Sequence, residues 1–97
     1  FNFLVEKNFR EHHTVSSYAG LLHKSPKTIT NTFNKIGEKS PLQAIHERIA
    51  LESKRLLHYT KKDISEIAYE LGFENVQAFS RFFKKQVGFS PTVFRIS

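Results

Sequence analysis

The chain has 97 residues, enough for one small domain or two tightly packed subdomains, and 39% of them are hydrophobic and can build a core. It contains no Cys, Met or Trp, which excludes disulfides, thiolate metal sites and cysteine nucleophiles. The formal net charge of +6 favours a polyanionic partner without identifying it, because many small domains are basic.

The sequence also argues against a membrane protein and against an enzyme. No apolar run approaches the roughly 18 residues of a membrane span and no signal-peptide pattern opens the chain, so we expect a cytoplasmic protein without a membrane partner. The five His, at positions 12, 13, 23, 46 and 58, lack the spacing of a metal-binding motif. Without a nucleophile and base pair or a glycine-rich phosphate loop, we expect neither catalysis nor a cofactor.

Two short helices are predicted at the beginning of the chain. The first covers residues 3–13, and the second runs from Val15 to about His23 behind Thr14, a favoured N-cap residue. Apolar residues at helical spacing give each helix one packing face. The residues expected on these faces are Leu4, Val5, Phe9 and His12, followed by Val15, Tyr18, Ala19 and Leu22.

Serine followed by proline marks three further helix starts, at Ser25, Ser40 and Ser90. Ser is a favoured N-cap, and Pro at the first helical position gives up an amide that has no helical partner. The helix after Ser25 ends at Gly37, and the helix after Ser40 is the longest and reaches about His58. Its roughly 17 residues span about 26 Å. The inward residues are expected to be Ile29, Phe33 and Ile36 in the shorter helix, and Leu42, Ile45, Ile49, Ser53, Leu56 and Leu57 in the longer one.

A short turn containing Gly72 separates two more predicted helices. Asp63 and Glu66 form a cap-plus-acid signature at the start of the first, and Asn75 is the N-cap of the second. Together they make a helix-turn-helix. In the second helix Phe82 lies off the core line, and we expect it to pack against the last helix or another domain. No segment alternates with period two, so the predicted class is all-α with about seven helices.

The chain contains an internal repeat. At an offset of 49 residues, Ala19 matches Ala68 and Leu22 matches Leu71. One residue is then inserted in the turn, and the offset becomes 50 residues. At this offset Ile29 matches Phe79, Phe33 matches Phe83 and Ser40-Pro41 matches Ser90-Pro91. The helix-turn-helix therefore occurs twice, although a duplicated helical hairpin of another function leaves the same pattern. Two such units joined by one long helix are suited to contact successive major-groove faces, which lie about 34 Å apart in B-DNA.

These residues resemble the signature of the AraC/XylS family of bacterial transcription regulators. The matching strings are Ile64–Leu71, Gly72-Phe73, Phe79-Ser80-Arg81-x-Phe83-Lys84, Gly88-Phe89-Ser90-Pro91 and Phe94-Arg95, with Ser25-Pro26, Phe33, Gly37, Ser40-Pro41, Arg48-Ile49 and Leu56-Leu57 in the first half. The resemblance implies two helix-turn-helix subdomains, residues 1–39 and 61–97, joined by a connecting helix at residues 40–60. It also implies an N-terminal sensing or dimerisation domain that is missing from this chain.

The resemblance places base contacts on the second helix of each helix-turn-helix. They fall at Lys27, Thr30 and Asn31 in the first unit, and at Val76, Gln77 and Arg81 in the second. Arg81 can donate two parallel hydrogen bonds to guanine, Asn31 and Gln77 can each bond adenine twice, and Val76 can touch only a thymine methyl. We expect phosphate contacts, which carry no sequence information, from Thr28, Lys35, Lys84 and Lys85 and at the helix N-termini of Ser40 and Ser90.

The leading hypothesis is sequence-specific binding of double-stranded DNA by a bacterial activator that brings RNA polymerase to a promoter. The alternative is a helical protein-interaction module with little salt-sensitive affinity for duplex DNA. For Arg81 the alternative is a surface ion pair with Glu70 or Glu74, and Arg48 is expected to pair with an acid such as Glu52 or to touch a phosphate. The Phe residues of the second helix-turn-helix are expected in the core rather than in a base-stacking platform.

Overall fold

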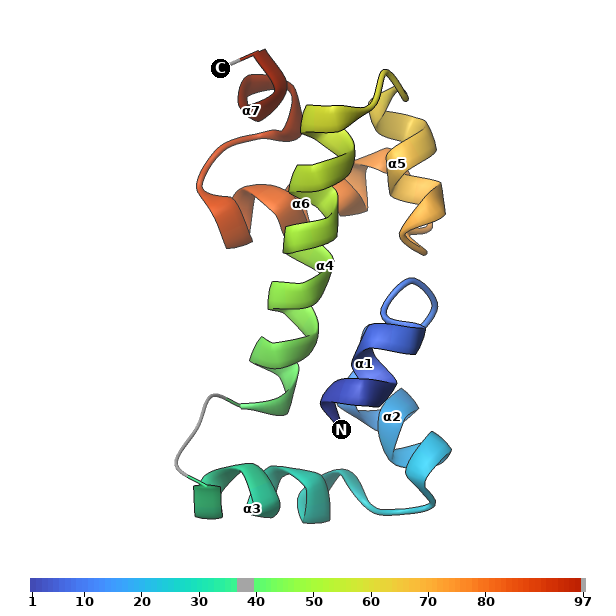
Figure 1. The fold of residues 1–97 in the computed structure, drawn as a ribbon, viewed down its shortest axis with the longest axis vertical. Coiled ribbons are helices and arrows are strands. Elements are labelled where there is room, and N and C mark those ends of the chain that lie inside the picture. Colours follow the sequence, from blue (N-terminus) through green and yellow to red (C-terminus); the bar gives the residue numbers. More distant parts are fainter. Residues whose placement is uncertain (37–39, 97) are drawn as a thin grey trace. The chain divides into compact units, whose positions relative to one another are not determined.

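The computed structural model describes residues 1–36 and 40–96, and every regular element in them is a helix (Figure 1). In chain order these are α1 Asn2–Asn8, α2 Val15–Leu22, α3 Pro26–Ile36, α4 Pro41–Tyr59, α5 Ile64–Glu70, α6 Val76–Val87 and α7 Pro91–Ile96. The predicted all-α class is confirmed. The predicted helix end at Gly37 and the predicted inward position of Ile36 lie outside the described residues and side chains.

The chain separates into two compact units, Phe1–Arg48 and Ile49–Ser97. The first unit contains the helix-turn-helix of α2 and α3, and the second contains that of α5 and α6 (Figure 1). The boundary between the units falls within α4, so this helix contributes residues to both. The predicted subdomain limits at residues 39 and 60 stay a prediction.

Side-chain caps start the helices where the sequence predicts them. The capping residues are Thr14, Ser25, Ser40, Asp63, Asn75 and Ser90, and each accepts a hydrogen bond from the amide three residues later at 2.8–3.2 Å. At Asp63 the capping box is complete, because the Glu66 side chain accepts from the Asp63 amide. Each such cap contributes typically about 1 kcal/mol to helix stability.

Aromatic side chains make up much of the core of the first unit. Phe9 and Tyr18 are buried, and the Phe1 ring lies 5.4 Å from the ring of Tyr18 and 5.2 Å from that of Phe33. Ile29 from α3 is also buried. The predicted packing faces of α2 and α3 are confirmed at these positions, with Phe33 half-buried.

The first helix is shorter than predicted. Instead of continuing to residue 13, α1 ends at Asn8, whose side-chain amide donates to the Leu4 carbonyl at 2.9 Å. The Asn8 carbonyl then accepts from the amides of Glu11 and His12, which closes a turn. The chain thus leaves the helix in this turn, and Thr14 then adopts an extended backbone and caps α2.

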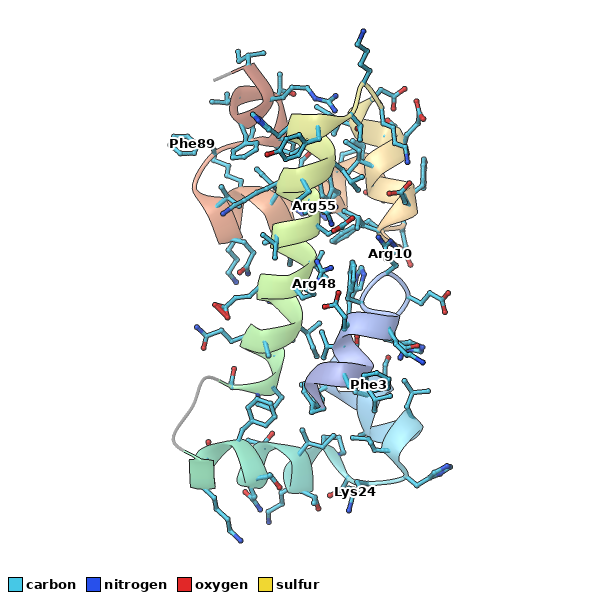
Figure 2. All side chains as sticks on the ribbon, viewed as in Figure 1. Phe3, Arg10, Lys24, Arg48, Arg55 and Phe89 are labelled. Carbon is cyan, nitrogen blue, oxygen red and sulfur yellow. The ribbon has the colours of Figure 1, made fainter. Side chains whose placement is uncertain are left out.

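Arg48 ties α4 to α1 within the first unit. Its Nε and Nη2 donate to the two carboxylate oxygens of Glu6 at 2.7 and 2.9 Å, and its guanidinium lies 4.1 Å from the centroid of the Phe9 ring (Figure 2). The acid that Arg48 contacts here is thus Glu6 of α1, while Glu52, the acid named as a candidate partner, accepts from Arg55 at 2.6 Å; the pairing of Arg48 with Glu52 or with a phosphate stays a prediction. A bidentate carboxylate and an aromatic face are both favourable partners for a planar guanidinium.

The buried side of α4 runs in steps of four residues from Pro41 through Ile45, Ile49, Ser53 and Leu57. Leu42, which we predicted to be inward, is 41% exposed because it stands one position off this line. Ser53 donates to the Ile49 carbonyl at 2.7 Å, so its hydroxyl is satisfied within the helix.

The second unit packs α5, α6 and α7 around two Phe side chains. Phe79 and Phe83 are buried, and Phe94 from α7 meets Phe83 edge-on at 5.4 Å between ring centroids. Phe82 lies 5.2 Å from Phe73 in the turn before α6. Phe82 thus packs against the helix-turn-helix turn, which the sequence did not indicate, and its packing against the last helix or another domain stays a prediction.

Arg95 of α7 holds the C-terminal end of α4. Its Nε donates to the Leu57 carbonyl at 3.1 Å and its Nη2 donates to the Thr60 carbonyl at 3.3 Å. The last carbonyls of a helix have no partner within the helix, so these two bonds satisfy groups that would otherwise depend on water.

Candidate nucleic-acid interface

The two helix-turn-helix turns share one hydrogen-bond pattern. His23 and Gly72 adopt the left-handed conformation, with φ of 56° and 86°. The residues that follow them, Lys24 and Phe73, donate their amides to Ala19 and Ala68 at 3.0 Å. This is the six-residue closure of a Schellman motif, and it supports the sequence repeat at the level of individual bonds.

The exposed side of α3 carries all the residues predicted there for DNA contact. Lys27, Thr28, Thr30, Asn31 and Lys35 are exposed. Three of them, at positions 27, 31 and 35, follow one another at steps of four residues and so form one stripe along the helix. The helix contains no Asp or Glu, so this stripe combines cations with hydrogen-bonding groups.

The exposed side of α6 repeats the stripe with different chemistry. Gln77, Arg81 and Lys85 stand at the positions equivalent to 27, 31 and 35, and all three are exposed, as is Lys84. This helix also lacks Asp and Glu. Val76 is half-buried, because it lies close to the side of the helix that carries Phe79 and Phe83. Five predicted contact residues thus lie on α6, and four of them are exposed.

Arg81 makes no ion pair with Glu70 or Glu74 in the described part of the chain. Glu70 accepts a hydrogen bond from Lys62 instead. The guanidinium on the exposed side of α6 is therefore not held by either of these two acids.

The phosphate-contact candidates at helix starts already use part of their bonding capacity. Ser40 Oγ accepts from Gln43 and Ser90 Oγ accepts from Val93. The Thr28 hydroxyl lies 2.8 Å from that of Ser25. One further hydroxyl or amide hydrogen at each of these helix starts remains for an anion, because a cap satisfies only one of the unpaired amides.

Two aromatic residues of α6 are excluded from the interface by their burial. Phe79 and Phe83 have no exposed surface, so neither can stack on a base, as predicted. Sequence reasoning missed Asn34, which is exposed on α3 at the repeat position of Lys84. The offset of 50 residues between the two stripes was the signal that could have identified it.

Each unit has the same formal charge. Residues 1–48 contain seven Lys or Arg and four Asp or Glu, residues 49–97 contain eight and five, and each half therefore carries +3. Within the residues that the structure describes, no group of three or more His, Asp or Glu could hold a metal ion. No described helix is long and apolar enough to cross a membrane.

The chain is similar to proteins of known family. A family model described as a helix-turn-helix domain matches residues 18–97. The bifunctional transcriptional activator/DNA repair enzyme AdaA of Bacillus subtilis is 35% identical over 91 residues, which are 94% of this chain and 43% of AdaA. The chain therefore spans less than half the length of this relative.

Solved structures show the same fold. The C-terminal domain of AraT, a response regulator from Geobacillus stearothermophilus, superposes with a TM-score of 0.86 at 28% identity, over 97% of this chain and 78% of that one. The DNA-binding domain of the global transcriptional factor AdpA, solved in complex with a target DNA, gives a TM-score of 0.78 at 27% identity, over 93% and 81% of the two chains.

Proposed function

Because the chain belongs to the AraC-type family of helix-turn-helix domains, we propose that it binds double-stranded DNA as the DNA-binding part of a bacterial transcription regulator. The observation that carries this proposal is the pair of equivalent, acid-free stripes on α3 and α6. Each stripe lies on the second helix of a helix-turn-helix, which is the helix that such motifs insert into the major groove.

The base contacts differ between the two helices. On α3 we assign them to Lys27, Thr30 and Asn31, with Asn31 bonding adenine through N6 and N7. On α6 we assign them to Gln77 and Arg81, with Arg81 bonding guanine through O6 and N7. Val76 is apolar and half-buried, and its one possible base contact is with a thymine methyl.

Phosphate contacts supply affinity and fix the register of each helix on the duplex. We assign them to Lys35 in the first unit and to Lys84 and Lys85 in the second, all of which are exposed. Thr28 and the helix starts at Ser40 and Ser90 add neutral donors. Because cations that neutralise phosphates release counterions, binding weakens as salt concentration rises.

The proposed function includes a regulatory role in transcription. We propose an activator that brings RNA polymerase to a promoter, which would place it with the nucleoid in the bacterial cytoplasm. A sensing or dimerisation domain N-terminal to this chain would control it. AdaA, which is described as a transcriptional activator and is more than twice as long as the matched segment, supports this arrangement.

Fluorescence anisotropy on duplexes selected from a random pool tests the DNA-binding proposal. We expect tight binding that weakens steeply with salt, and Arg81→Ala should lose about 1 to 3 kcal/mol with relaxed preference at one base pair. Lys61→Ala, which changes an exposed lysine outside α3 and α6, is the matched control. Weak binding that is equal for wild type and Arg81→Ala would contradict the base assignment and favour the protein-interaction module.

A further inference from the structure

An open groove lies beside the turn of the first helix-turn-helix. Its volume is about 270 Å³, and its lining residues are Phe1, Leu22, Lys24, Thr28, Ile29 and Thr32. Three of these are apolar, and Lys24 has the one charged side chain among the six; Figure 2 labels it in the turn between α2 and α3. The groove thus offers apolar walls together with one cationic side chain.

The second helix-turn-helix shows what occupies the equivalent place in the other copy of the repeat. Lys24 is equivalent to Phe73, because each donates its amide to the corresponding Ala carbonyl. Thr32 is equivalent to Phe82 at the offset of 50 residues that relates α3 to α6. In the second unit the rings of Phe73 and Phe82 lie 5.2 Å apart and pack together.

The first unit therefore lacks two phenyl rings at a place where its repeat has them. A hydrophobic contact commonly accompanies the Schellman closure, and it is made by the residue at the position of Lys24 and Phe73. Lys24 is exposed and does not make this contact as Phe73 does. The absence of the two rings leaves a groove against Leu22, which is half-buried, and above Ile29, which is 5% exposed and forms its floor.

The polar groups of the groove select the charge of an occupant. The hydroxyl of Thr28 lies 2.8 Å from that of Ser25, and the Thr32 hydroxyl donates to the Thr28 carbonyl at 3.0 Å. The Thr32 hydroxyl hydrogen is thus used within the protein, and the Thr28 hydroxyl shares one hydrogen bond with Ser25. Lys24 Nζ has no hydrogen bond or ion pair to any residue that the structure describes, so its charge is available to an anion.

We propose that this groove binds a small aromatic carboxylate. The ring of the ligand takes the place that Phe73 and Phe82 fill in the second unit, and its carboxylate pairs with Lys24. A molecule of this size gives a weak complex, with a dissociation constant on the order of 1 mM. The site does not depend on the proposed DNA binding, and its test needs no DNA.

The test is a titration of the ¹⁵N-labelled protein with phenylacetate, followed by amide chemical shifts. We expect saturable shifts at Lys24, Thr28 and Thr32, and binding at least about five-fold weaker for the neutral 2-phenylethanol, because a charged partner strengthens a hydrogen bond to Lys24. Lys24→Gln should weaken phenylacetate binding to the same extent. Lys61→Gln, at an exposed lysine of the second unit, should leave it unchanged.

A second variant tests the role of the missing rings. Thr32→Phe places a ring where the second unit has Phe82, and it should abolish the saturable shifts. If that variant does not fold, Lys24→Gln still decides the matter. Shifts that do not saturate, that map outside the groove, or that are the same for phenylacetate and 2-phenylethanol would overturn the proposal.

Discussion

The two helix-turn-helix turns close with the same backbone bonds but are packed differently. In the second unit Gly72 takes the left-handed position and Phe73 packs against the rings of Phe79 and Phe82. In the first unit His23 holds the left-handed position and Lys24 leaves a groove open. Backbone hydrogen bonds are thus sufficient to form the turn, while apolar packing decides how firmly it is held against its recognition helix.

The largest expected difference between the units concerns their equivalent core residues Phe83 and Phe33. Phe83 has no exposed surface, whereas Phe33 is half-buried. We expect Phe83→Ala to lower the free energy of unfolding by about 3–5 kcal/mol and Phe33→Ala to lower it by roughly half as much, because less apolar surface is lost. Urea denaturation of the two variants measures this. Equal losses would show that the first core is packed as tightly as the second.

Tyr18 and its repeat equivalent Ile67 differ in pH sensitivity. Both are fully buried, but the Tyr18 hydroxyl has no hydrogen-bond partner among the described residues, and burial raises the pKa of Tyr18 from 10.0 to about 12. The folded state therefore favours the neutral phenol. The contribution of Tyr18 to the free energy of unfolding is fully present below pH 10. It falls by about 2–3 kcal/mol as the pH rises to about 12, since one pKa unit corresponds to 1.36 kcal/mol.

Tyr18→Phe is the variant that isolates this loss. It should remove the alkaline loss and should not destabilise the protein at pH 7, because it deletes a buried polar group without a partner. Thermal unfolding at pH 7, 10 and 11 compares the two proteins. Tyr59→Phe, at a tyrosine that is 79% exposed, is the control and should behave as wild type. An alkaline loss that survives in Tyr18→Phe would assign it to other groups.

The left-handed residues of the two turns should respond differently to alanine. Gly72→Ala places a Cβ at φ 86° and should cost about 1–2 kcal/mol. His23→Ala should be nearly neutral, because His23 already carries a Cβ at φ 56°. Denaturation midpoints under identical conditions give the comparison. A larger loss for His23→Ala would mean that its imidazole, rather than its backbone, holds the first turn.

The smallest expected difference concerns the phosphate contacts at equivalent positions 35 and 85. If both helices lie on the duplex, Lys35→Ala and Lys85→Ala should each lower the slope of log affinity against log salt by about 1, without altering base preference. Anisotropy at four or more salt concentrations measures the slopes. A change for only one of the two lysines would show that a single unit contacts the backbone at this position.

Local chemistry made the helix starts predictable from the sequence. A Ser, Thr, Asp or Asn cap acts on an amide three residues away, so Ser25 or Asn75 can be identified without knowledge of the rest of the molecule. The outward stripe on α6 follows equally from the periodicity that buries Phe79 and Phe83.

Contacts between distant parts of the chain were not predictable in the same way. Glu6, which accepts two hydrogen bonds from Arg48, lies 42 residues earlier in the sequence and is not indicated by helical spacing, which suggests only an acid one turn away such as Glu52. The end of α1, the packing of Phe82 on Phe73 and the exposure of Leu42 depend on which elements meet, and helical periodicity does not specify that. The groove beside Lys24 exists because the first unit has no rings where the second unit has Phe73 and Phe82. This difference is seen only when the two turns are compared in three dimensions.

The lack of acidic residues in α3 and α6 has a kinetic consequence for the proposed function. A contact face without Asp or Glu does not repel phosphates at any point, so an encounter with any stretch of duplex holds the protein close to it. Such loosely held protein can slide and hop between neighbouring sites. The domain would then find its operator mainly by scanning along the DNA on which it first lands, and crowding that DNA with other bound proteins would slow the search.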